Sequence, residues 1–307
     1  MRVFVTGVGG QLGHDVMNEL HKRGHEGIGS DIAPQYSGAQ DGSAVTTMPY
    51  VQLDITDAAA VSRVLREVKP DAVVHCAAWT AVDAAEDEEN QPKVRAINAE
   101  GTANIAEICK ELDCKMVYIS TDYVFNGQGE TPWQPDCKDY APLNFYGQTK
   151  LEGELAVSGR LEKYFIVRIA WVFGLNGKNF IKTMLKLGET HDTLRVVNDQ
   201  IGTPTYTLDL SRLLVDMIET ERYGYYHATN EGGYISWYDF ARAIFKAAGM
   251  RVNVLPVTTA EYGESKAKRP FNSRLDKSKL KENGFQPLPA WQDALERYME
   301  NGREGNR

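Results

Sequence analysis

The sequence contains little cysteine, and its four cysteines follow no functional spacing. Cys76, Cys109, Cys114 and Cys137 include no C-x-x-C pair and no arrangement typical of metal ligands. The spacing therefore indicates neither a zinc site nor a thiol-redox motif. We expect four free thiols in the reducing environment of the cytoplasm.

Long apolar runs are absent as well. No stretch of about 18 consecutive apolar residues occurs, so we expect no membrane-spanning helix. The apolar run near the first residue, Val3-Phe4-Val5, is too short for the core of a signal peptide. These observations predict a protein that has no membrane partner.

Clustered positive charge is also scarce. The formal net charge is −8, and the longest basic cluster is the short segment Lys266-Ala-Lys268-Arg269. An acidic chain without a basic patch argues against a nucleic-acid partner. A basic cluster of this size suits one anionic small molecule better.

The composition is otherwise that of an ordinary globular protein, with 42% hydrophobic and 25% charged residues. A chain of 307 residues can bury roughly three quarters of the surface that it exposes when unfolded. We therefore expect a large core and one or two domains.

Strands and helices alternate along the first part of the chain, from a buried strand at 2–6 to a strand at 164–171. Among them we expect a strand over 50–57 that ends in a helix cap, and helices over 58–68 and 96–112. This alternation predicts an α/β fold of the Rossmann type, with a doubly wound parallel sheet and right-handed crossovers.

After residue 172 the alternation weakens, although we still expect elements such as a helix over 237–248 that Ser236 caps. We predict a dinucleotide-binding domain and a smaller, partly discontinuous C-terminal substrate-binding domain. The dinucleotide-binding domain covers 1–171, with return segments near 203–228. The substrate-binding domain covers 172–202 and 229–307.

A glycine-rich turn follows the first predicted strand and opens the first predicted helix. Gly7, Gly10 and Gly13 allow a tight turn, close approach of a pyrophosphate and packing of the helix on the strand. The helix N-terminus would then face the phosphate charge. Asp31 ends the second predicted strand, where a carboxylate binds a ribose hydroxyl in dinucleotide-binding folds. The alternatives are a tight turn without a ligand and a capping role for Asp31.

Tyr146 and Lys150 lie four residues apart on a predicted helix, and therefore on one face of it. A phenol has a reference pKa of about 10, and a nearby ammonium lowers that pKa by favouring the phenolate. Such a phenol can give a proton to a carbonyl oxygen while hydride reaches the carbon. The alternative is a surface tyrosine and a surface lysine that share a helix face by chance.

Five longer strings carry a resemblance to a known family. They are CAAWTAVDAAE at 76–86, STDYVF at 120–125, RIAWVFG at 168–174, NDQIGTPT at 198–205 and RPFNS at 269–273. With the glycine-rich turn and the Tyr-x-x-x-Lys pair, they resemble the extended short-chain dehydrogenase/reductases. Within that superfamily they are similar to the dTDP-4-dehydrorhamnose reductases, over nearly the whole chain. The resemblance implies reduction of the C4 keto group of dTDP-4-dehydro-β-L-rhamnose to dTDP-β-L-rhamnose, the last step in making this sugar nucleotide for cell-surface polysaccharide.

The resemblance also implies roles for individual residues. The catalytic group it implies is Thr121, which bonds the carbonyl oxygen, Tyr146, which donates the proton, and Lys150, which lowers the pKa of Tyr146 and holds the nicotinamide ribose. The implied cofactor-binding residues, besides Tyr146 and Lys150, are Gly7, Gly10, Gln11, Leu12, Gly13, Asp31, Asp54, Ile55, Ala77, Ala78 and Thr80. The implied substrate-binding residues, besides Thr121 and Tyr146, are Val82, Asp122, Tyr123, Trp171, Gln200 and Arg269. Trp171 has the alternative of a core residue, and Arg269 that of a solvated loop charge.

One position separates this interpretation from related enzymes. Nucleotide-sugar 4,6-dehydratases of the same fold have an Asp-Glu pair after Ser-Thr, whereas this chain has Asp122-Tyr123. Because a phenol replaces the glutamate, the elimination base is missing, which favours simple reduction. The other interpretations left open are an epimerase, a reductase for a related sugar such as the talose series, and a non-catalytic regulatory subunit.

Cofactor choice, metal and assembly are less strongly indicated. Asp31 has no Arg or Lys after it before residue 40, and a carboxylate there repels a 2′-phosphate, which favours NADH. The resemblance implies NADPH, so we expect NADPH to work and NADH to be accepted too. Some members of the family are dimers bridged by magnesium, but Asp15 and the 189–192 stretch are poor counterparts for its ligands. We expect that magnesium is not required for chemistry and that the protein is a monomer or a weak homodimer.

Overall fold

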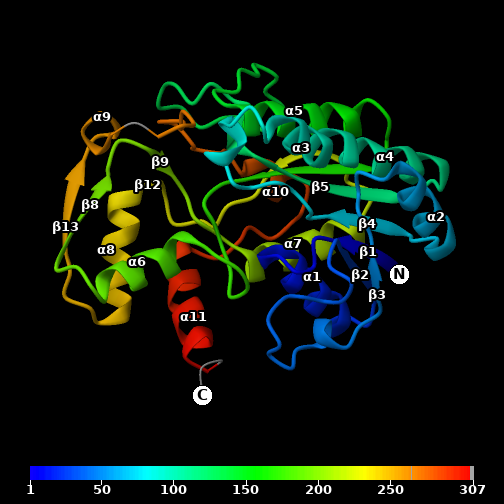
Figure 1. Cartoon of the computed structure of the whole chain (residues 1–307), viewed down its shortest axis with the longest axis horizontal. Coiled ribbons are helices and arrows are strands. Elements are labelled where there is room, and N and C mark those ends of the chain that lie inside the picture. Colours follow the sequence, from blue (N-terminus) through cyan, green and yellow to red (C-terminus); the bar gives the residue numbers. More distant parts are fainter. Residues whose placement is uncertain (264, 305–307) are drawn as a thin grey trace.

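A seven-stranded parallel sheet forms the centre of the molecule in the computed structural model, which describes residues 1–263 and 265–304 (Figure 1). The strands, in sheet order, are β11 (Gly224–His227), β6 (Tyr164–Ile169), β5 (Lys115–Thr121), β4 (Ala72–His75), β1 (Arg2–Thr6), β2 (Glu26–Asp31) and β3 (Tyr50–Gln52). Chain order reverses between β1 and β4, where Thr6 pairs with His75. The predicted Rossmann-type sheet is confirmed. A crevice is expected beyond the carboxyl ends of β1 and β4.

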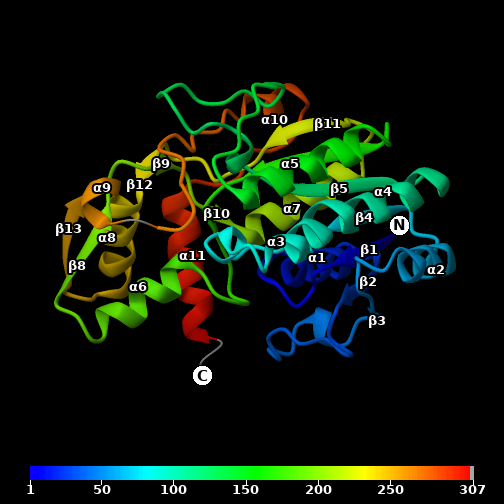
Figure 2. The ribbon, with the colours of Figure 1, turned by 45° about the horizontal axis from the view of Figure 1, so that its top comes forward.

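Helices cover both faces of this sheet (Figures 1 and 2). One face is covered by α1 (Gln11–Lys22) and α7 (Thr207–Ile218), and the other by α2 (Ala58–Val68), α4 (Thr102–Glu111) and α5 (Phe145–Ser158). Successive side chains of a strand point to opposite faces, so Val3 and Val5 join one core cluster while Phe4 joins the other. Both faces of the sheet are therefore buried, as expected for a parallel sheet.

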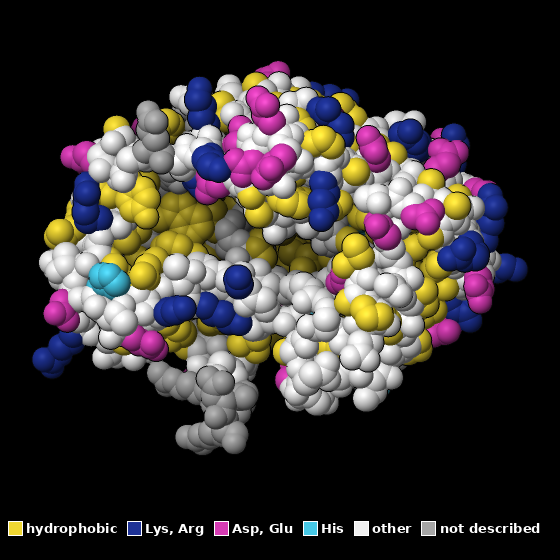
Figure 3. Space-filling view, viewed as in Figure 1, with side chains coloured by type: hydrophobic (Ala, Val, Ile, Leu, Met, Phe, Trp, Pro, Cys, Tyr) yellow, Lys and Arg dark blue, Asp and Glu magenta, His cyan; other side chains and the backbone are white. Residues whose placement is uncertain are grey.

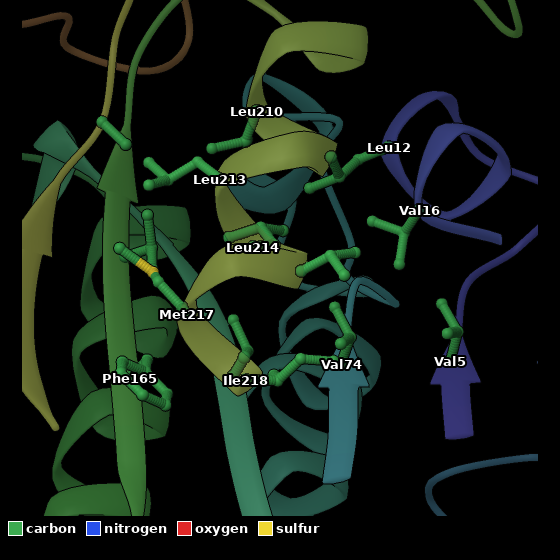
Figure 4. Packing of buried hydrophobic residues seen from close by; sticks show 14 of the residues in the cluster. Val5, Leu12, Val16, Val74, Phe165, Leu210, Leu213, Leu214, Met217 and Ile218 are labelled. Atoms are coloured by element: carbon green, nitrogen blue, oxygen red, sulfur yellow. The ribbon is translucent and has the colours of Figure 1, made fainter. Parts of the chain in front are cut away.

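Figure 4 shows the first of these clusters, in which α7 lies over the strands. Leu210, Leu213 and Leu214 of α7 belong to one cluster with Val74 and Phe165 of the sheet, and all five are buried. Burying a side chain of this size contributes about 1.5–3 kcal/mol. This packing holds the sheet edge that carries the crevice in a fixed position.

The helix predicted over 96–112 is interrupted. The chain forms α3 (Gln91–Arg95), a π-helical segment η3 (Ala96–Gly101) and then α4. Within η3 the buried Asn98 side chain binds the backbone of Trp79, accepting from its N–H at 2.8 Å and donating to its carbonyl at 3.2 Å. The wider turn thereby ties this helix to the segment that leaves β4. Such π-segments are frequent near functional sites.

Residues after 172 build a second set of helices and small sheets beside the main sheet (Figure 1). Its helices are α6 (Phe180–Gly188), α8 (Trp237–Ala248), α9 (Thr259–Tyr262) and α11 (Trp291–Glu304). Its strand pairs are β7 (Val172–Phe173) with β10 (Thr205–Tyr206), β9 (Ile201–Gly202) with β12 (Ile235–Ser236), and β8 (Thr193–Val197) with β13 (Asn253–Val257). The remaining short helices are η1 (Ala44–Thr46), η2 (Ala84–Glu86), η4 (Asp122–Val124) and α10 (Ser278–Glu282).

This second set has its own aromatic core, to which Phe173, Tyr206 and Phe240 belong. The segment that contains α7 and β11 lies with the main sheet instead, where β11 pairs with β6. The division into two domains at residue 171 stays a prediction, and its last residues, 305–307, lie outside the described residues. In the described part of the chain every helix is too short or too polar to span a bilayer.

Candidate active site

A cavity of about 900 Å³ opens at the carboxyl ends of the parallel strands. Figure 3 shows a hollow with hydrophobic side chains across the middle of this face of the molecule. The cavity begins at Thr6, the last residue of β1, and at Gly7, reaches Thr121 at the end of β5, and extends to Trp237 of α8. It therefore lies at the reversal of strand order, where doubly wound sheets bind their ligands.

The glycine-rich turn forms one wall of this cavity. Gly7 has φ +71°, and a Cβ there would lie 2.6 Å from the backbone nitrogen of Ala77. A Cβ on Gly13 would lie 2.4 Å from the carbonyl oxygen of Gly7. Only glycine fits these two positions, and the turn presents bare backbone at the N-terminus of α1. Such a cradle fits a pyrophosphate. Gly10, Gln11 and Leu12, predicted to lie along it, also line the cavity.

Acidic and apolar residues continue the wall beyond the turn. Asp31 accepts hydrogen bonds from the backbone N–H groups of Gly9, at 2.9 Å, and Ile32, at 2.8 Å. Asp54 accepts from the N–H and the hydroxyl of Thr56, which turns the chain after the short β3. The third strand therefore ends at Gln52, earlier than the predicted strand over 50–57. The structure thus places the predicted residues Asp31, Asp54 and Ile55 along the same wall.

Thr121, Tyr146 and Lys150 meet at the inner part of the cavity. Thr121 ends β5, and its hydroxyl accepts from the N–H of Tyr123 at 3.2 Å. Tyr146 and Lys150 share a face of α5, whose start is fixed by Asn144: its side-chain oxygen accepts from the N–H of Gly147 at 2.8 Å. The three residues predicted to be catalytic therefore come together from two separate elements.

Burial controls the charges of this group. Lys150 is 3% exposed, and its ammonium lies 4.2 Å from the centre of the Tyr118 ring. Burial lowers the pKa of Lys150 to about 7, while the charge of Glu154 acts in the opposite direction. Burial also raises the pKa of Tyr146 above its ordinary value. The charge of Asp122 raises it further, and hydrogen bonding with Thr121 lowers it.

This result corrects one expectation. The sequence predicts that Lys150 lowers the pKa of Tyr146, but in this geometry the pKa of Tyr146 is raised. The physical reason is desolvation together with the charge of Asp122, which disfavour the phenolate more than the hydrogen bond with Thr121 favours it. Tyr146 therefore holds its proton at neutral pH.

Asp122 and Tyr123 lie directly beside this group on the cavity wall. Asp122 is 2% exposed, and burial raises its pKa to about 6, against hydrogen bonds with Ser273 and Thr121. The hydroxyl of Thr121 donates to its carboxylate at 3.0 Å. Because residue 123 is a tyrosine, Thr121 is followed by a carboxyl group at Asp122 and a phenol at Tyr123.

Ala77, Ala78, Thr80, Val82 and Trp171 line the cavity, as the sequence predicts. Sequence reasoning missed other lining residues, among them Lys93, Lys178 and Trp237. Trp237 begins α8 after the cap residue Ser236, and nothing in the local sequence pattern distinguishes it from a core residue. Only the path of the chain brings it to this wall.

Two predicted substrate-binding residues do not line the cavity. Gln200 is buried, and its amide nitrogen donates to the hydroxyl of Thr259 at 3.1 Å. The guanidinium of Arg269 binds both carboxylate oxygens of Asp83, at 2.7 and 3.1 Å. This hydrogen bonding raises the pKa of Arg269. Arg269 is therefore paired in a partly exposed loop, and its diphosphate contact and the alternative of a solvated loop charge both stay predictions.

In residues 1–263 and 265–304 no group of three or more His, Cys, Asp or Glu side chains is arranged to hold a metal ion. Asp15, considered for magnesium from the sequence, is 8% exposed and accepts a hydrogen bond from the hydroxyl of Thr207 at 2.5 Å. The described cysteines are free, as expected: Cys76, Cys109, Cys114 and Cys137.

Comparison with known proteins gives a consistent result over nearly the whole chain. The family model described as "RmlD substrate binding domain" matches residues 1–304. The chain is 38% identical to the spore coat polysaccharide biosynthesis protein SpsK of Bacillus subtilis, with 97% of each chain covered. It is also 38% identical to dTDP-4-dehydrorhamnose reductase of Streptomyces griseus, covering 96% of this chain and 91% of that protein.

A solved structure agrees with these relatives. The crystal structure of dTDP-4-dehydrorhamnose reductase from Bacillus anthracis in complex with NADP is 39% identical to this chain. The TM-score is 0.87, with 98% of this chain and 99% of that chain covered.

Proposed function

Because the chain belongs to the RmlD family of dTDP-4-dehydrorhamnose reductases, we propose that it reduces the C4 keto group of dTDP-4-dehydro-β-L-rhamnose to dTDP-β-L-rhamnose. The product is an activated sugar for cell-surface polysaccharide. The observation that carries the proposal is the convergence of Thr121, Tyr146 and Lys150 in one cavity with the glycine cradle. This combination supports proton donation beside a dinucleotide.

The residues divide the chemistry between them. The cradle of Gly7, Gly10 and Gly13 fits the pyrophosphate of a nicotinamide dinucleotide. When this cofactor is bound, it supplies hydride to the sugar carbon. Tyr146 then gives its proton to the carbonyl oxygen, since its raised pKa keeps it protonated. Thr121 donates a hydrogen bond to the same oxygen by turning its hydroxyl away from the Asp122 carboxylate. Lys150, with a pKa of about 7, holds the nicotinamide ribose and supplies positive charge near the developing phenolate.

The neighbouring residues define the substrate. Val82, Asp122, Tyr123 and Trp171 line the cavity around the proton donor and hold the sugar. Gln200 donates to the hydroxyl of Thr259 instead of facing the ligand. Arg269 binds the substrate diphosphate by exchanging Asp83 for phosphate oxygens, since its fork of donors suits both partners.

Cofactor choice, metal and assembly belong to the same proposal. Both NADPH and NADH serve as reductants: the family favours NADPH, and Asp31, which accepts hydrogen bonds from the N–H groups of Gly9 and Ile32 beside the ribose position, favours NADH. Magnesium binding is compatible with the proposal, but no step assigned here requires it. The enzyme works in the cytoplasm as a monomer or a weak homodimer.

One assay tests the proposal. Purified protein is mixed with dTDP-4-dehydrorhamnose and NADPH or NADH, and the nicotinamide absorbance is followed over time. We expect oxidation of the reduced cofactor and a product with the rhamno configuration, identified by NMR. A talo product would contradict the substrate pose. No oxidation with either cofactor would support a non-catalytic relative, against which the intact Thr121, Tyr146 and Lys150 argue.

A further inference from the structure

Two tryptophans stack face to face on the wall of the cavity. The ring centroids of Trp171 and Trp237 are 3.8 Å apart, and the ring planes differ by 18°. Both residues line the cavity. Trp171 follows β6 of the main sheet, whereas Trp237 is the first residue of α8. The stack therefore joins the sheet to the C-terminal helices at the ligand cavity.

The backbone of Trp171 is strained. Its φ of +51° lies in the left-handed region, which costs free energy for a residue with a bulky side chain. Such a conformation persists only where the surroundings hold it. The backbone carbonyl of Trp171 accepts from the N–H of Thr205 at 3.1 Å. A Cβ at Gly202 would lie 3.0 Å from the Trp171 ring, so the glycine at this position makes room for the indole.

Trp237 is itself held firmly. It follows Ser236, whose hydroxyl accepts from the N–H of Asp239, and the carboxylate of Asp239 accepts from the N–H of Ser236 at 3.0 Å. This capping box fixes the first turn of α8. Ile235 of β12 pairs with Gly202 of β9, and the Phe180 ring packs on Trp237 with centroids 4.6 Å apart. The position of Trp237 is thus set by a helix cap, a strand pair and an aromatic contact.

We propose that Trp237 is a positioning residue for the sugar ring of the substrate. This role rests on the proposed function. Trp237 holds the Trp171 indole in place, so that the indole forms a flat part of the cavity wall. The apolar face of a deoxyhexulose ring packs on that wall, since aromatic rings bury C–H surface well. Without Trp237 the strained Trp171 relaxes and the wall is lost. The glycine cradle is built from other residues, so binding of the dinucleotide is unaffected.

A double-mutant cycle tests this coupling. The four proteins are the wild type, Trp171→Leu, Trp237→Leu and the double variant, and kcat/KM for the nucleotide sugar is measured for each. We expect Trp237→Leu to lower kcat/KM about tenfold, equivalent to about 1.4 kcal/mol, mainly through KM for the sugar. KM for the cofactor should change less than about twofold. In the Trp171→Leu background the same substitution should change kcat/KM less than about twofold, because the positioned ring is gone.

Circular dichroism reports on the stack without any turnover. Two indoles in face-to-face contact couple their electronic transitions and give a paired positive and negative band. We expect this band in the wild type, a change in it on addition of the dTDP-sugar, and its loss in both single variants. Trp237→Phe keeps an aromatic face and should restore most of kcat/KM although the band is lost.

The matched control is Trp133→Leu. Trp133 stacks on Phe125 with centroids 4.5 Å apart and does not itself line the cavity. This variant removes a stacked tryptophan of the same kind, and it should keep the paired band and near-wild-type kinetics. Thermal unfolding checks that each variant is folded.

Two outcomes overturn the inference. Additive effects of the two substitutions would show that Trp237 does not act through Trp171. An equal rise of KM for the cofactor and for the sugar would show a general structural role. Either result can occur with an active wild type, whereas an inactive wild type counts against the proposed function.

Discussion

The ring of Tyr123 meets the ring of Tyr146 edge to face, with centroids 5.7 Å apart and planes at 82°. A phenol therefore lies against Tyr146, the proton donor that we propose, at the position where related dehydratases have a glutamate. Burial raises the pKa of Tyr123, so this phenol is not a base near neutral pH. The structure gives a chemical reason why reduction is not accompanied by loss of water.

This relationship predicts that the protein does not dehydrate a nucleotide sugar. Incubation with dTDP-glucose and NAD should leave the sugar nucleotide unchanged, because no base at position 123 can remove the proton that elimination requires. Mass spectrometry of the sugar nucleotide checks the result. Accumulation of a product lighter by one water would contradict the assignment of Tyr123.

Arg269→Met tests the proposed diphosphate contact. We expect KM for the dTDP-sugar to rise about tenfold or more, because a charge-assisted hydrogen bond contributes about 1.5–3 kcal/mol. KM for the cofactor should not change. Steady-state kinetics with each substrate varied in turn gives both values.

Asp83→Asn is the companion variant for this test. It weakens the competing pair with Arg269, so KM for the dTDP-sugar should fall or stay constant. A partly exposed pair of this kind contributes at most about 1 kcal/mol to stability, and folding should persist. If Arg269→Met leaves KM for the sugar unchanged, the guanidinium serves only its pair with Asp83.

Cofactor preference should be weak. We expect kcat/KM for NADPH and NADH to differ by less than about a hundredfold, roughly 2.7 kcal/mol. Asp31→Asn keeps an oxygen that accepts from Gly9 and removes the charge that repels a 2′-phosphate. The variant should therefore shift the ratio toward NADPH. A wild-type preference above about a hundredfold would show that the role given to Asp31 is wrong.

The buried Lys150 should lower the free energy of unfolding at neutral pH. Its folded pKa of about 7 lies below its ordinary value near 10.5, so the unfolded state binds the proton more tightly. The cost is fully present below about pH 7, falls as pH rises, and is gone above about pH 10. A shift of one unit corresponds to about 1.4 kcal/mol.

Lys150→Met removes this cost together with the charge. We expect its Tm near pH 6 to exceed that of the wild type by at least about 2 °C, and the difference to shrink toward pH 10. Activity should fall at every pH, because the ribose contact is lost. A variant that is less stable than the wild type near pH 6 would contradict the burial argument.

Much of the fold is predictable from local sequence, because local chemistry sets element boundaries. The predicted helix over 58–68 is α2, since the Asp57 side chain accepts from the N–H of Ala60 and fixes its start. The predicted helix over 237–248 is α8, fixed by the capping box of Ser236. The glycine-rich turn is predictable from local sequence too. Gly7 directly follows the first predicted strand, and it has the positive φ that glycine adopts readily.

Other features depend on contacts that local patterns do not contain. The pair between Arg269 and Asp83 joins residues 186 positions apart in the sequence, and the place of Trp237 on the cavity wall depends on the whole path of the chain. The π-helical turn at Asn98 interrupts a segment that reads as continuous helix. The direction of the Tyr146 pKa shift depends on burial, which spacing to Lys150 does not reveal.

Tyr146→Phe gives the most direct test of the central claim. The substitution removes one oxygen and little volume, so folding and cofactor binding should persist. A positioned acid contributes about 10²–10⁴-fold, or roughly 3–5 kcal/mol, and kcat should fall by that factor. Tyr123→Phe removes the same atom from the adjacent ring and should lower kcat by less than about tenfold. If Tyr146→Phe turns over within about threefold of the wild type, the proton comes from elsewhere and Tyr146 is structural.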